Sequence, residues 1–442
     1  MKKKLTIVLA AALLAFAPAA HGAGFLIYEH GVAAMAMGGA FTAVANNPSA
    51  IWHNPAGLSW VEGTQVLLGA TFIIPSGSVN MPSPPNPSPP PLLLGPTTFK
   101  QANQVFTPPN VYITHKFSDR VTAGIGFMAP FGLGTEWPNT TNSPFPLRYL
   151  GYKNDMKTFF VNPTIAVKLL DRLSVGFGVS YIFSDLTLDL YQSVVLPPPP
   201  AVGLPYDVPT AMKGSGDSFN FNAGVLYKGK GFSLGASYRS HFNIKYSGTV
   251  NLDNQFVPAP LQPYIPPEGT VTTTFKFPAI LTVGLAIDIS EKLLWSFDFH
   301  TYFWGRFDSY TADIVFPSPY PAQTLTAPQN WKDAHCTRTG FQYKASDKLT
   351  LRLGGFYDET PQPVETMDPN LPDNDRWAVT GGVGYKIGKF TIDVGCHFEH
   401  FFARTSEHGY FLTGGIPVDP NPVAGRYKTQ ALLLGINLGY NF

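Results

Sequence analysis

Beyond residue 63, apolar side chains alternate with polar or small ones in one stretch after another. A period of two residues places successive side chains on opposite faces of a β-strand. Two stretches show this pattern clearly. Residues 172–189 divide into Leu173, Val175, Phe177, Val179, Tyr181 and Phe183 against Ser174, Gly176, Gly178, Ser180 and Ser184, and residues 428–442 divide into Leu432, Leu434, Ile436, Leu438, Tyr440 and Phe442 against Thr429, Ala431, Gly435, Asn437 and Asn441. The pattern predicts an all-β fold in which each strand has one apolar face.

Two kinds of connection separate these strands. Six are short and charged: 116–120, 168–172, 227–231, 288–292, 343–348 and 385–389. Seven are long and rich in proline: 76–104, 130–155, 190–213, 248–268, 309–329, 359–374 and 405–427. The two kinds alternate, so they delimit fourteen strands: 64–75, 104–117, 120–130, 155–170, 172–189, 214–228, 230–247, 269–289, 292–308, 330–344, 347–358, 375–386, 389–404 and 428–442. An even number of antiparallel strands with short turns at one end and long loops at the other is typical of a transmembrane β-barrel.

One segment near the N-terminus, residues 24–62, has neither a strand pattern nor the polarity of a loop. It is rich in Ala, Gly and Met, and two Asn-Pro steps interrupt it, at Asn47-Pro48 and Asn54-Pro55. Proline restricts the residue before it and lacks an N–H donor, so each step ends a short helix or forms a turn. We therefore predict that residues 23–62 form a small, partly helical hatch, which plugs the lumen of a barrel formed by residues 63–442.

The first 22 residues have the three parts of a secretory signal peptide. Lysines occupy positions 2–4, an apolar run covers 5–17, and small residues precede Ala23. No later run approaches the roughly 18 continuous apolar residues of a membrane helix, so strands would have to cross the bilayer. We predict export to the bacterial outer membrane, with outer-membrane lipid and lipopolysaccharide as neighbours of a monomeric barrel.

The composition supports this class. Charged residues are 13% of the chain, about half the share of an average soluble domain, and aromatic residues are 14%. With 30 basic and 29 acidic residues, nothing indicates a nucleic-acid partner. A soluble β-sandwich would also alternate, but the signal peptide, the regular turns and the strand lengths favour a barrel. Cys336 and Cys396 fit no metal motif, and whether they form a disulfide is left open. We expect no metal and no cofactor.

Several fragments, taken in order along the chain, resemble the FadL/TodX (OMPP1) family of outer-membrane transporters for hydrophobic compounds. The fragments are Glu29-His30, Met37-Gly38-Gly39-Ala40, Asn54-Pro55-Ala56-Gly57-Leu58, residues 129–135 with Trp137, Asn162-Pro163, residues 237–240, Phe277-Pro278-Ala279, residues 331–333, residues 349–354, Tyr357-Asp358 and residues 372–376. The resemblance implies the same fourteen-stranded barrel with a hatch. It also implies passive, ligand-gated uptake and release of cargo sideways at the third strand.

The resemblance favours long-chain fatty acids as cargo, with aromatic hydrocarbons as the alternative within the family. A general porin would have an unplugged, charged lumen, which the apolar hatch argues against. A barrel lipid hydrolase would need a Ser and His pair at convincing spacing, and none is evident. A receptor that used only its loops would leave the hatch without a purpose. We therefore predict a transporter and not an enzyme.

Three groups of residues are candidates for the functional site. For the hatch and its gating, the resemblance points to Asn54, Pro55, Ala56 and Phe25. For an inward kink of the third strand, which the resemblance implies, the candidates are Gly124, Gly126, Pro130 and Gly132, because Gly and Pro weaken strand pairing. For ligand binding, they are Arg338, Arg352 and Arg239, which could pair with a carboxylate, and the apolar Phe131, Leu133, Trp137 and Phe145.

Overall fold

The computed structural model describes residues 24–81, 97–139, 145, 147–195, 205–260, 262–266, 268–406 and 425–442. The predicted signal peptide, residues 1–22, lies outside the described residues, as do parts of several predicted long loops. No helix in these described ranges is long and apolar enough to cross a membrane.

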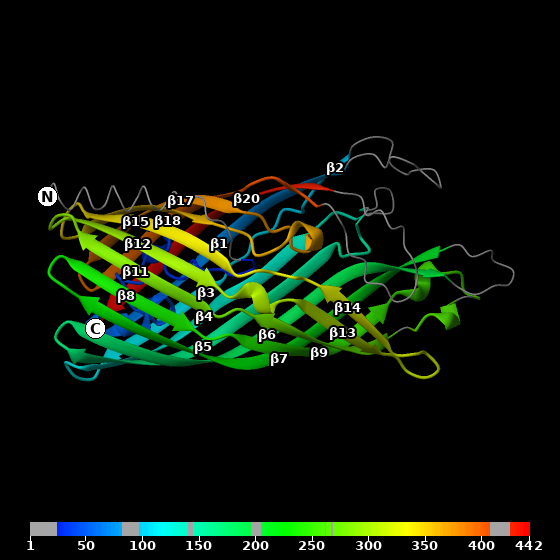
Figure 1. Cartoon of the computed structure of the whole chain (residues 1–442), viewed down its shortest axis with the longest axis horizontal. Coiled ribbons are helices and arrows are strands. Elements are labelled where there is room, and N and C mark those ends of the chain that lie inside the picture. The colour runs from blue at the N-terminus through cyan, green and yellow to red at the C-terminus, as the bar shows by residue number, and fades with distance from the viewer. Residues whose placement is uncertain are drawn as a thin grey trace.

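Strand segments in the described residues form a single closed antiparallel sheet (Figure 1). Their bounds are β1 (Thr64–Met81), β2 (Thr97–Lys100), β3 (Pro109–Lys116), β4 (Val121–Glu136), β5 (Lys153–Leu170), β6 (Leu173–Val195), β7 (Pro205–Lys228), β8 (Phe232–Arg239), β9 (Phe242–Leu252), β10 (Glu268–Phe277), β11 (Ile280–Asp288), β12 (Leu293–Tyr302), β13 (Ser309–Val315), β14 (Gln323–Pro328), β15 (Ala334–Lys344), β16 (Leu349–Asp358), β17 (Arg376–Ile387), β18 (Phe390–Phe401), β19 (Arg404–Thr405) and β20 (Arg426–Asn441). Pairing of β1 with β20, from Gln65 opposite Asn441 to Asn80 opposite Arg426, closes the barrel.

The segments combine into fourteen barrel strands, as predicted. Six of these barrel strands are interrupted. Each of the six consists of two consecutive segments that lie end to end in the sheet. For example, β8 and β9 both pair with β7, and β2 and β3 both pair with β1. The other interrupted strands are β10 with β11, β12 with β13, β14 with β15, and β18 with β19. The C-terminus lies at the end of the barrel that carries the short turns (Figure 1).

Several of the predicted long loops are partly wrong, because strands continue into them, as at 190–213 and 309–329. β6 extends to Val195 and β7 begins at Pro205, inside the predicted loop 190–213. The predicted loop 309–329 holds the hairpin of β13 and β14, in which the Thr324 hydroxyl donates a hydrogen bond to Asp313 (2.8 Å). Proline-rich composition marked these segments as loops, yet cross-strand pairs of polar residues continue the ladder beyond the apolar belt.

The two faces of the strands are as the alternation predicted. Phe177, Val179 and Tyr181 of β6 are exposed on the outer surface, while Ser174 and Ser180 are buried toward the lumen. On β20, the outward side chains Leu432, Leu434, Ile436 and Leu438 alternate with the buried Ala431, Leu433 and Asn437. The apolar face is therefore the lipid face, which is the arrangement of a membrane-spanning barrel.

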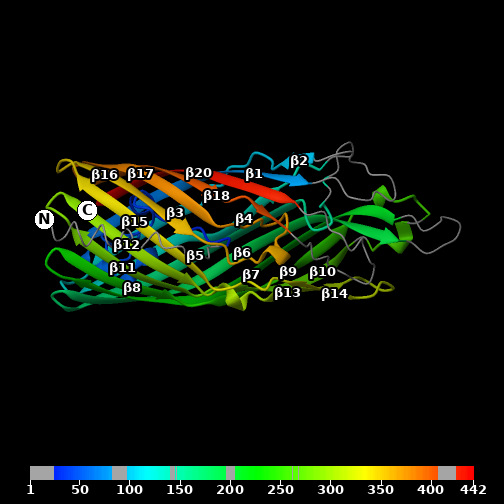
Figure 2. The same ribbon diagram turned by 45° about the horizontal axis from the view of Figure 1, so that its top comes forward.

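The hatch lies inside the barrel (Figure 2). It contains α2 (Val32–Met35), α3 (Ala50–His53) and the 3-10 helix η1 (Pro55–Trp60), and nearly all of its side chains are buried. Strand glycines let it lie directly against the wall. A Cβ atom on Gly224 would come within 2.1 Å of Asn54 Oδ1, and one on Gly176 within 2.3 Å of the Pro55 carbonyl carbon. Outside the hatch, short 3-10 helices occur at η2 (Asn254–Phe256), η3 (Gln262–Tyr264), η4 (Trp304–Arg306) and η5 (Val364–Thr366).

Candidate functional site

The Asn54 side chain fixes the turn that the sequence predicted for the hatch. Its Oδ1 accepts a hydrogen bond from the N–H of Ala56 (3.2 Å), which caps η1, and Pro55 occupies the first turn of η1. Its Nδ2 donates to the carbonyls of Thr42 (2.9 Å) and Val225 (3.1 Å). The Ser174 hydroxyl donates to the Ala56 carbonyl (2.9 Å). These directional bonds tie the turn to the rest of the hatch and to β6 and β7.

The N-terminal end of the hatch contacts the barrel differently. The backbone around Leu26 pairs with β4: Ile27 N–H donates to the Pro130 carbonyl (2.8 Å), and Gly132 N–H donates to the Phe25 carbonyl (3.2 Å). The Phe25 ring packs edge-on against several buried aromatic rings. Centroid distances are 4.8 Å to Trp304, 5.6 Å to Phe277, 5.8 Å to Trp331, and 6.2 Å to both Phe131 and Phe307. Apolar contact therefore dominates this end.

The third barrel strand, β4, is irregular where Gly and Pro predicted a kink. Its pairing with β5 shifts between Met128 and Phe131, so one extra residue of β4 lies opposite β5. This is a β-bulge, and Pro130 within it has no N–H to donate. Gly124 and Gly126 precede the bulge, and Gly132 follows it. A Cβ atom on Gly124 would meet Ile51 of the hatch, and one on Gly126 would meet the ring of Tyr112.

A cavity of about 390 Å³ adjoins the bulge and the N-terminal end of the hatch. We call it the first cavity. Its aromatic lining is Phe25, Phe106, Phe131, Phe159 and Phe401, and its aliphatic lining includes Leu26, Ile27, Leu133, Met156 and Leu371. Phe159 stacks on Phe183, which is exposed on the lipid face (5.4 Å, 26°). The first cavity therefore reaches the barrel wall at the bulge.

A smaller cavity of about 130 Å³, which we call the second cavity, shares Phe25, Leu133 and Leu371 with the first. Its other apolar lining residues are Leu186, Leu188, Met212, Tyr246, Val271, Phe275, Phe307, Tyr310 and Trp331. Phe25 thus lines both apolar spaces.

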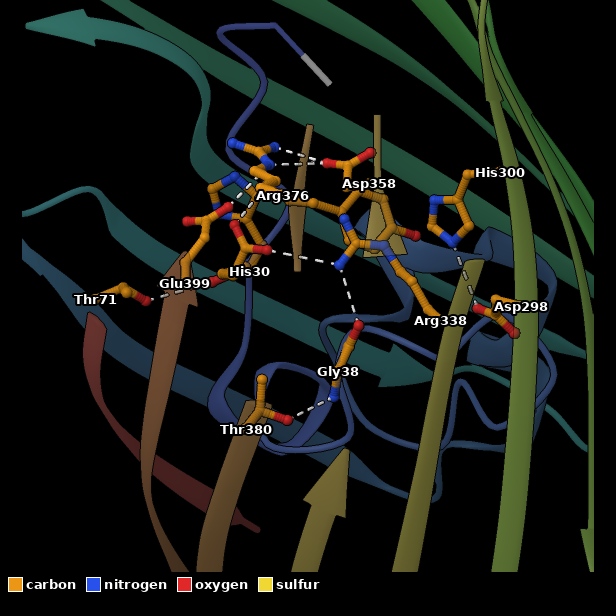
Figure 3. Close-up of polar contacts among 12 residues, drawn as sticks. His30, Gly38, Thr71, Asp298, His300, Arg338, Asp358, Arg376, Thr380 and Glu399 are labelled. Atoms are coloured by element: carbon orange, nitrogen blue, oxygen red, sulfur yellow. Dashed lines mark hydrogen bonds and ion pairs between the residues drawn. The ribbon is translucent and has the colours of Figure 1, made fainter. Parts of the chain in front are cut away.

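Ionic side chains line one side of the first cavity. Figure 3 shows Arg376 with its partners Asp358 and Glu399. Arg376 of β17 is held by two carboxylates. Its Nη2 lies 2.7 Å from Asp358 Oδ2, and its Nε lies 2.8 Å from Glu399 Oε1. Glu29 of the hatch and Asp373 also line this side. Burial raises the pKa of Asp373, which lies in the segment between β16 and β17, to about 7.

Arg338 of β15 anchors the hatch from the same wall. It donates from Nη1 to the Gly38 carbonyl (3.0 Å), and Nη1 lies 3.6 Å from Glu29 Oε1. Its guanidinium stacks between the rings of Tyr28 and Phe356 (4.5 and 4.4 Å). Asp298 of β12 acts similarly, because its Oδ2 accepts hydrogen bonds from the backbone N–H of Phe41 and Thr42 (2.9 and 2.8 Å).

The structure brings some of the predicted ligand residues together and separates others. Phe131 and Leu133 line the first cavity beside Phe25. Trp137 and Phe145 stack on each other (5.1 Å) in another buried cluster with Tyr427.

The predicted arginines lie outside the lining of both cavities. Arg239 packs over Trp52 (4.5 Å) and contacts Asn162, and Arg352 pairs with Asp393 (2.6 Å). The ligand role of Trp137, Phe145 and the three arginines stays a prediction.

Four aromatic residues beside Phe25 had no place among the candidates: Phe277, Trp304, Phe307 and Trp331. Trp304 follows β12 and Trp331 precedes β15, at points where the two barrel strands are interrupted. The alternation of apolar and polar residues does not reveal such interruptions. Arg376 and Glu399 lie on the lumen side of their strands, but only the structure shows them at a cavity. Cys336 and Cys396 do not form a disulfide with each other. Both are free thiols, of which Cys336 is buried and Cys396 is exposed.

Known proteins resemble this chain over nearly its whole length. A long-chain fatty acid transport protein of Salmonella typhi is 23% identical over 457 residues, covering 98% of each chain. A 47 kDa outer membrane protein of Pasteurella multocida is 24% identical over 455 residues, again covering 98% of each.

Solved structures share the fold. A FadL homologue of Pseudomonas aeruginosa matches with a TM-score of 0.78 at 19% identity, covering 95% of this chain and 100% of the other. The toluene transporter TbuX of Ralstonia pickettii matches with a TM-score of 0.67 at 20% identity, covering 93% and 98%. The family model described as outer membrane protein transport protein (OMPP1/FadL/TodX) matches residues 13–442, so this barrel with its lumenal hatch belongs to that family of outer-membrane transport proteins.

Proposed function

We propose that this protein carries small hydrophobic molecules passively across the bacterial outer membrane. The observation that carries the proposal is the pair of apolar cavities that the hatch residue Phe25 lines, inside a barrel whose lumen the hatch fills. A channel for polar solutes would need a continuous water-filled lumen lined by polar groups. The curated relatives named as long-chain fatty acid transport proteins and the solved toluene transporters support hydrophobic cargo.

The proposed path uses both cavities. Cargo enters from the end with the long loops, occupies the second cavity, passes Phe25 and occupies the first cavity. It leaves sideways at the bulge of β4, where the first cavity meets Phe159 in the wall. Sideways release suits an apolar molecule, because it passes into lipid without crossing water.

In this proposal the N-terminal end of the hatch is the gate. Residues 25–27 bond to the bulge and line the first cavity, so displacing them would open the path and free the Pro130 carbonyl and the Gly132 N–H together. Asn54, Pro55 and Ala56 serve as the fixed end against which this segment moves. The family consists of transport proteins, and the absence of enzymatic activity in this chain is part of the proposal, as are the monomeric state and lipopolysaccharide contact.

Uptake by whole cells tests the proposal. Cells that produce the protein should take up labelled oleate or labelled toluene faster than cells that lack it. Phe25→Ala should change that rate, because it joins the two cavities. Phe299→Ala, which removes an exposed ring on the lipid face of β12, is the matched control and should behave as the wild type. If neither compound enters faster than in cells without the barrel, the proposal is wrong.

A further inference from the structure

The ion pairs beside the first cavity point to the charge of the cargo. We propose that this site selects uncharged hydrophobic molecules and rejects carboxylates, and that Glu399 and Asp358 set this specificity by neutralising Arg376. The inference rests on the proposed function, because it concerns the cargo of the same cavity. It chooses between the two classes that the sequence left open, in favour of neutral compounds such as aromatic hydrocarbons and fatty alcohols.

The cations of the first cavity are already paired with carboxylates of the protein. Among the described residues that line it, the basic ones are Lys157 and Arg376. Lys157 Nζ lies 2.6 Å from Asp155 Oδ2. Arg376 donates from Nε and Nη2 to Asp358 Oδ2 and also contacts Glu399 Oε1. The Lys157 pair is exposed, so the enclosed cation is Arg376, and a carboxylate that bound there would have to displace one of its two protein carboxylates.

Further carboxylates lie on the same side of the first cavity as Arg376. Glu29 and Asp373 line the first cavity together with Glu399. Glu29 has Arg338 as its nearest cation, at 3.6 Å, and Arg338 is fully enclosed between aromatic rings and the hatch backbone. An anionic ligand would meet the negative charge of Glu29 beside an apolar lining, where an uncompensated charge is costly. A neutral ligand does not encounter this cost.

The remaining lining of the first cavity is aromatic and apolar. Rings of Phe25, Phe106, Phe131, Phe159 and Phe401 surround the space. Edge-to-face contact with such rings favours flat or apolar molecules. An engineered apolar cavity of roughly 150 Å³ binds benzene, so a cavity of about 390 Å³ has room for a substituted aromatic ring or a folded alkyl chain.

The second cavity offers one other place for a carboxylate. Lys213 of β7 lines it, but this lysine is exposed, and the acidic Asp368 lines the same cavity. A head group bound at Lys213 would contradict the proposal, so Lys213 enters the test.

The test compares two cargoes that differ only in charge. Uptake of labelled dodecan-1-ol and labelled dodecanoate is measured in cells that produce the full-length protein, with folding checked by heat-modifiable migration on gels. We expect the protein to accelerate uptake of the alcohol at least tenfold more than uptake of the carboxylate. If both compounds enter equally fast through the protein, the specificity proposal falls while the transport proposal stands. If neither enters above background, the transport proposal falls.

Variants locate the source of the selectivity. Glu399→Gln leaves Arg376 with one carboxylate, so the ratio of dodecanoate to dodecanol uptake should rise roughly tenfold, and Asp358→Asn should raise it in the same direction. Asp393→Asn is the matched control, because it removes the carboxylate partner of Arg352, which lies outside the lining of both cavities. The proposed role of Arg376 and its partners is wrong if Asp393→Asn is the variant that raises the ratio while Glu399→Gln and Asp358→Asn do not. It is also wrong if Lys213→Gln, made in the otherwise unchanged protein, abolishes dodecanoate uptake.

Discussion

The two ends of the hatch are held by different forces. The Asn54 end is fixed by directional hydrogen bonds to the hatch and to β7, and the neighbouring loop is held by Asp298 and Arg338. The Phe25 end has two backbone hydrogen bonds to a bulged strand and otherwise rests on aromatic contacts beside cavities. Hydrogen bonds with buried partners are costly to break, whereas apolar contacts beside a cavity can be replaced by an apolar ligand. The contrast indicates a fixed end and a movable end.

The largest expected effect is at the fixed end. Arg338→Met would leave Glu29 and the Gly38 carbonyl without their cation inside the lumen. Removing one partner of a buried charge network typically costs about 3 to 5 kcal/mol. Thermal or urea unfolding in detergent micelles measures the loss. Lys276→Met, at a half-exposed ion pair with Asp308, is the control and should cost less than about 1 kcal/mol. Equal losses in the two variants would contradict the anchoring role of Arg338.

The next effect is local and concerns the movable end. Phe25→Ala should remove about 2 to 3 kcal/mol of apolar contact, less than for a ring in a cavity-free core, because the site already borders empty space. Amide hydrogen exchange should then become faster at Ile27 and Gly132, while the unfolding midpoint of the barrel changes little. A large fall in that midpoint, with unchanged exchange at the two amides, would show that Phe25 belongs to the fixed end.

Asn54→Ala should have a smaller effect of about 1 to 2 kcal/mol, because it removes the cap of η1 and the side-chain bonds to Thr42 and Val225. The readout is limited proteolysis or exchange at the Ala56 amide, which loses its acceptor. Asn80→Ala is a matched control, since the Asn80 amide bonds the exposed side chain of Thr98. No change at Ala56 would contradict the capping role of Asn54.

The smallest predicted effect is a pH dependence of the hatch. Burial lowers the pKa of His30 to about 3 and that of His53 to about 4, from ordinary values near 6.5. Between these values the unfolded chain binds more protons than the folded one, so stability is complete above pH 6.5 and is lost as the pH falls. For each histidine, the free energy of unfolding should fall by about 1 kcal/mol between pH 7 and pH 5.5.

His30→Phe keeps a ring beside Trp52 and removes the titration, so stability should depend less steeply on pH in this variant. Unfolding midpoints of the variant and the wild type, measured at pH 7 and at pH 5.5, give the two slopes. Equal slopes would show that His30 does not contribute to the pH dependence.

Much of the barrel follows from the sequence, because a period of two residues and alternating turn lengths are local properties. They predicted fourteen strands, the lipid face and the hatch segment. They missed the strand extensions beyond the apolar belt, where polar pairs such as Thr324 and Asp313 replace the apolar alternation.

The site follows less well, because it depends on which distant residues meet. Phe131 and Leu133, candidates from a segment that resembles the family, line the first cavity, and the bulge lies where Gly and Pro predicted a kink, but the roles of these residues stay predictions. The environment of each arginine could not be read from the chain, since Arg352 and Arg376 look alike in a strand pattern. Only the strand register shows that Arg352 meets Asp393 and that Arg376 meets Asp358 beside the first cavity.

A disulfide between the hatch and the bulge tests whether the Phe25 end of the hatch moves to open the path. Leu26 and Phe131 form an antiparallel bridge flanked by the hydrogen bonds of Ile27 and Gly132, so their Cα atoms should lie within disulfide reach. The variant Leu26→Cys with Phe131→Cys, in a background with Cys336→Ser and Cys396→Ser, locks the movable end when oxidised. Oxidation should lower toluene uptake to the level of cells without the protein, and reduction should restore it. Equal uptake in the oxidised and reduced states would contradict a gate at this end of the hatch.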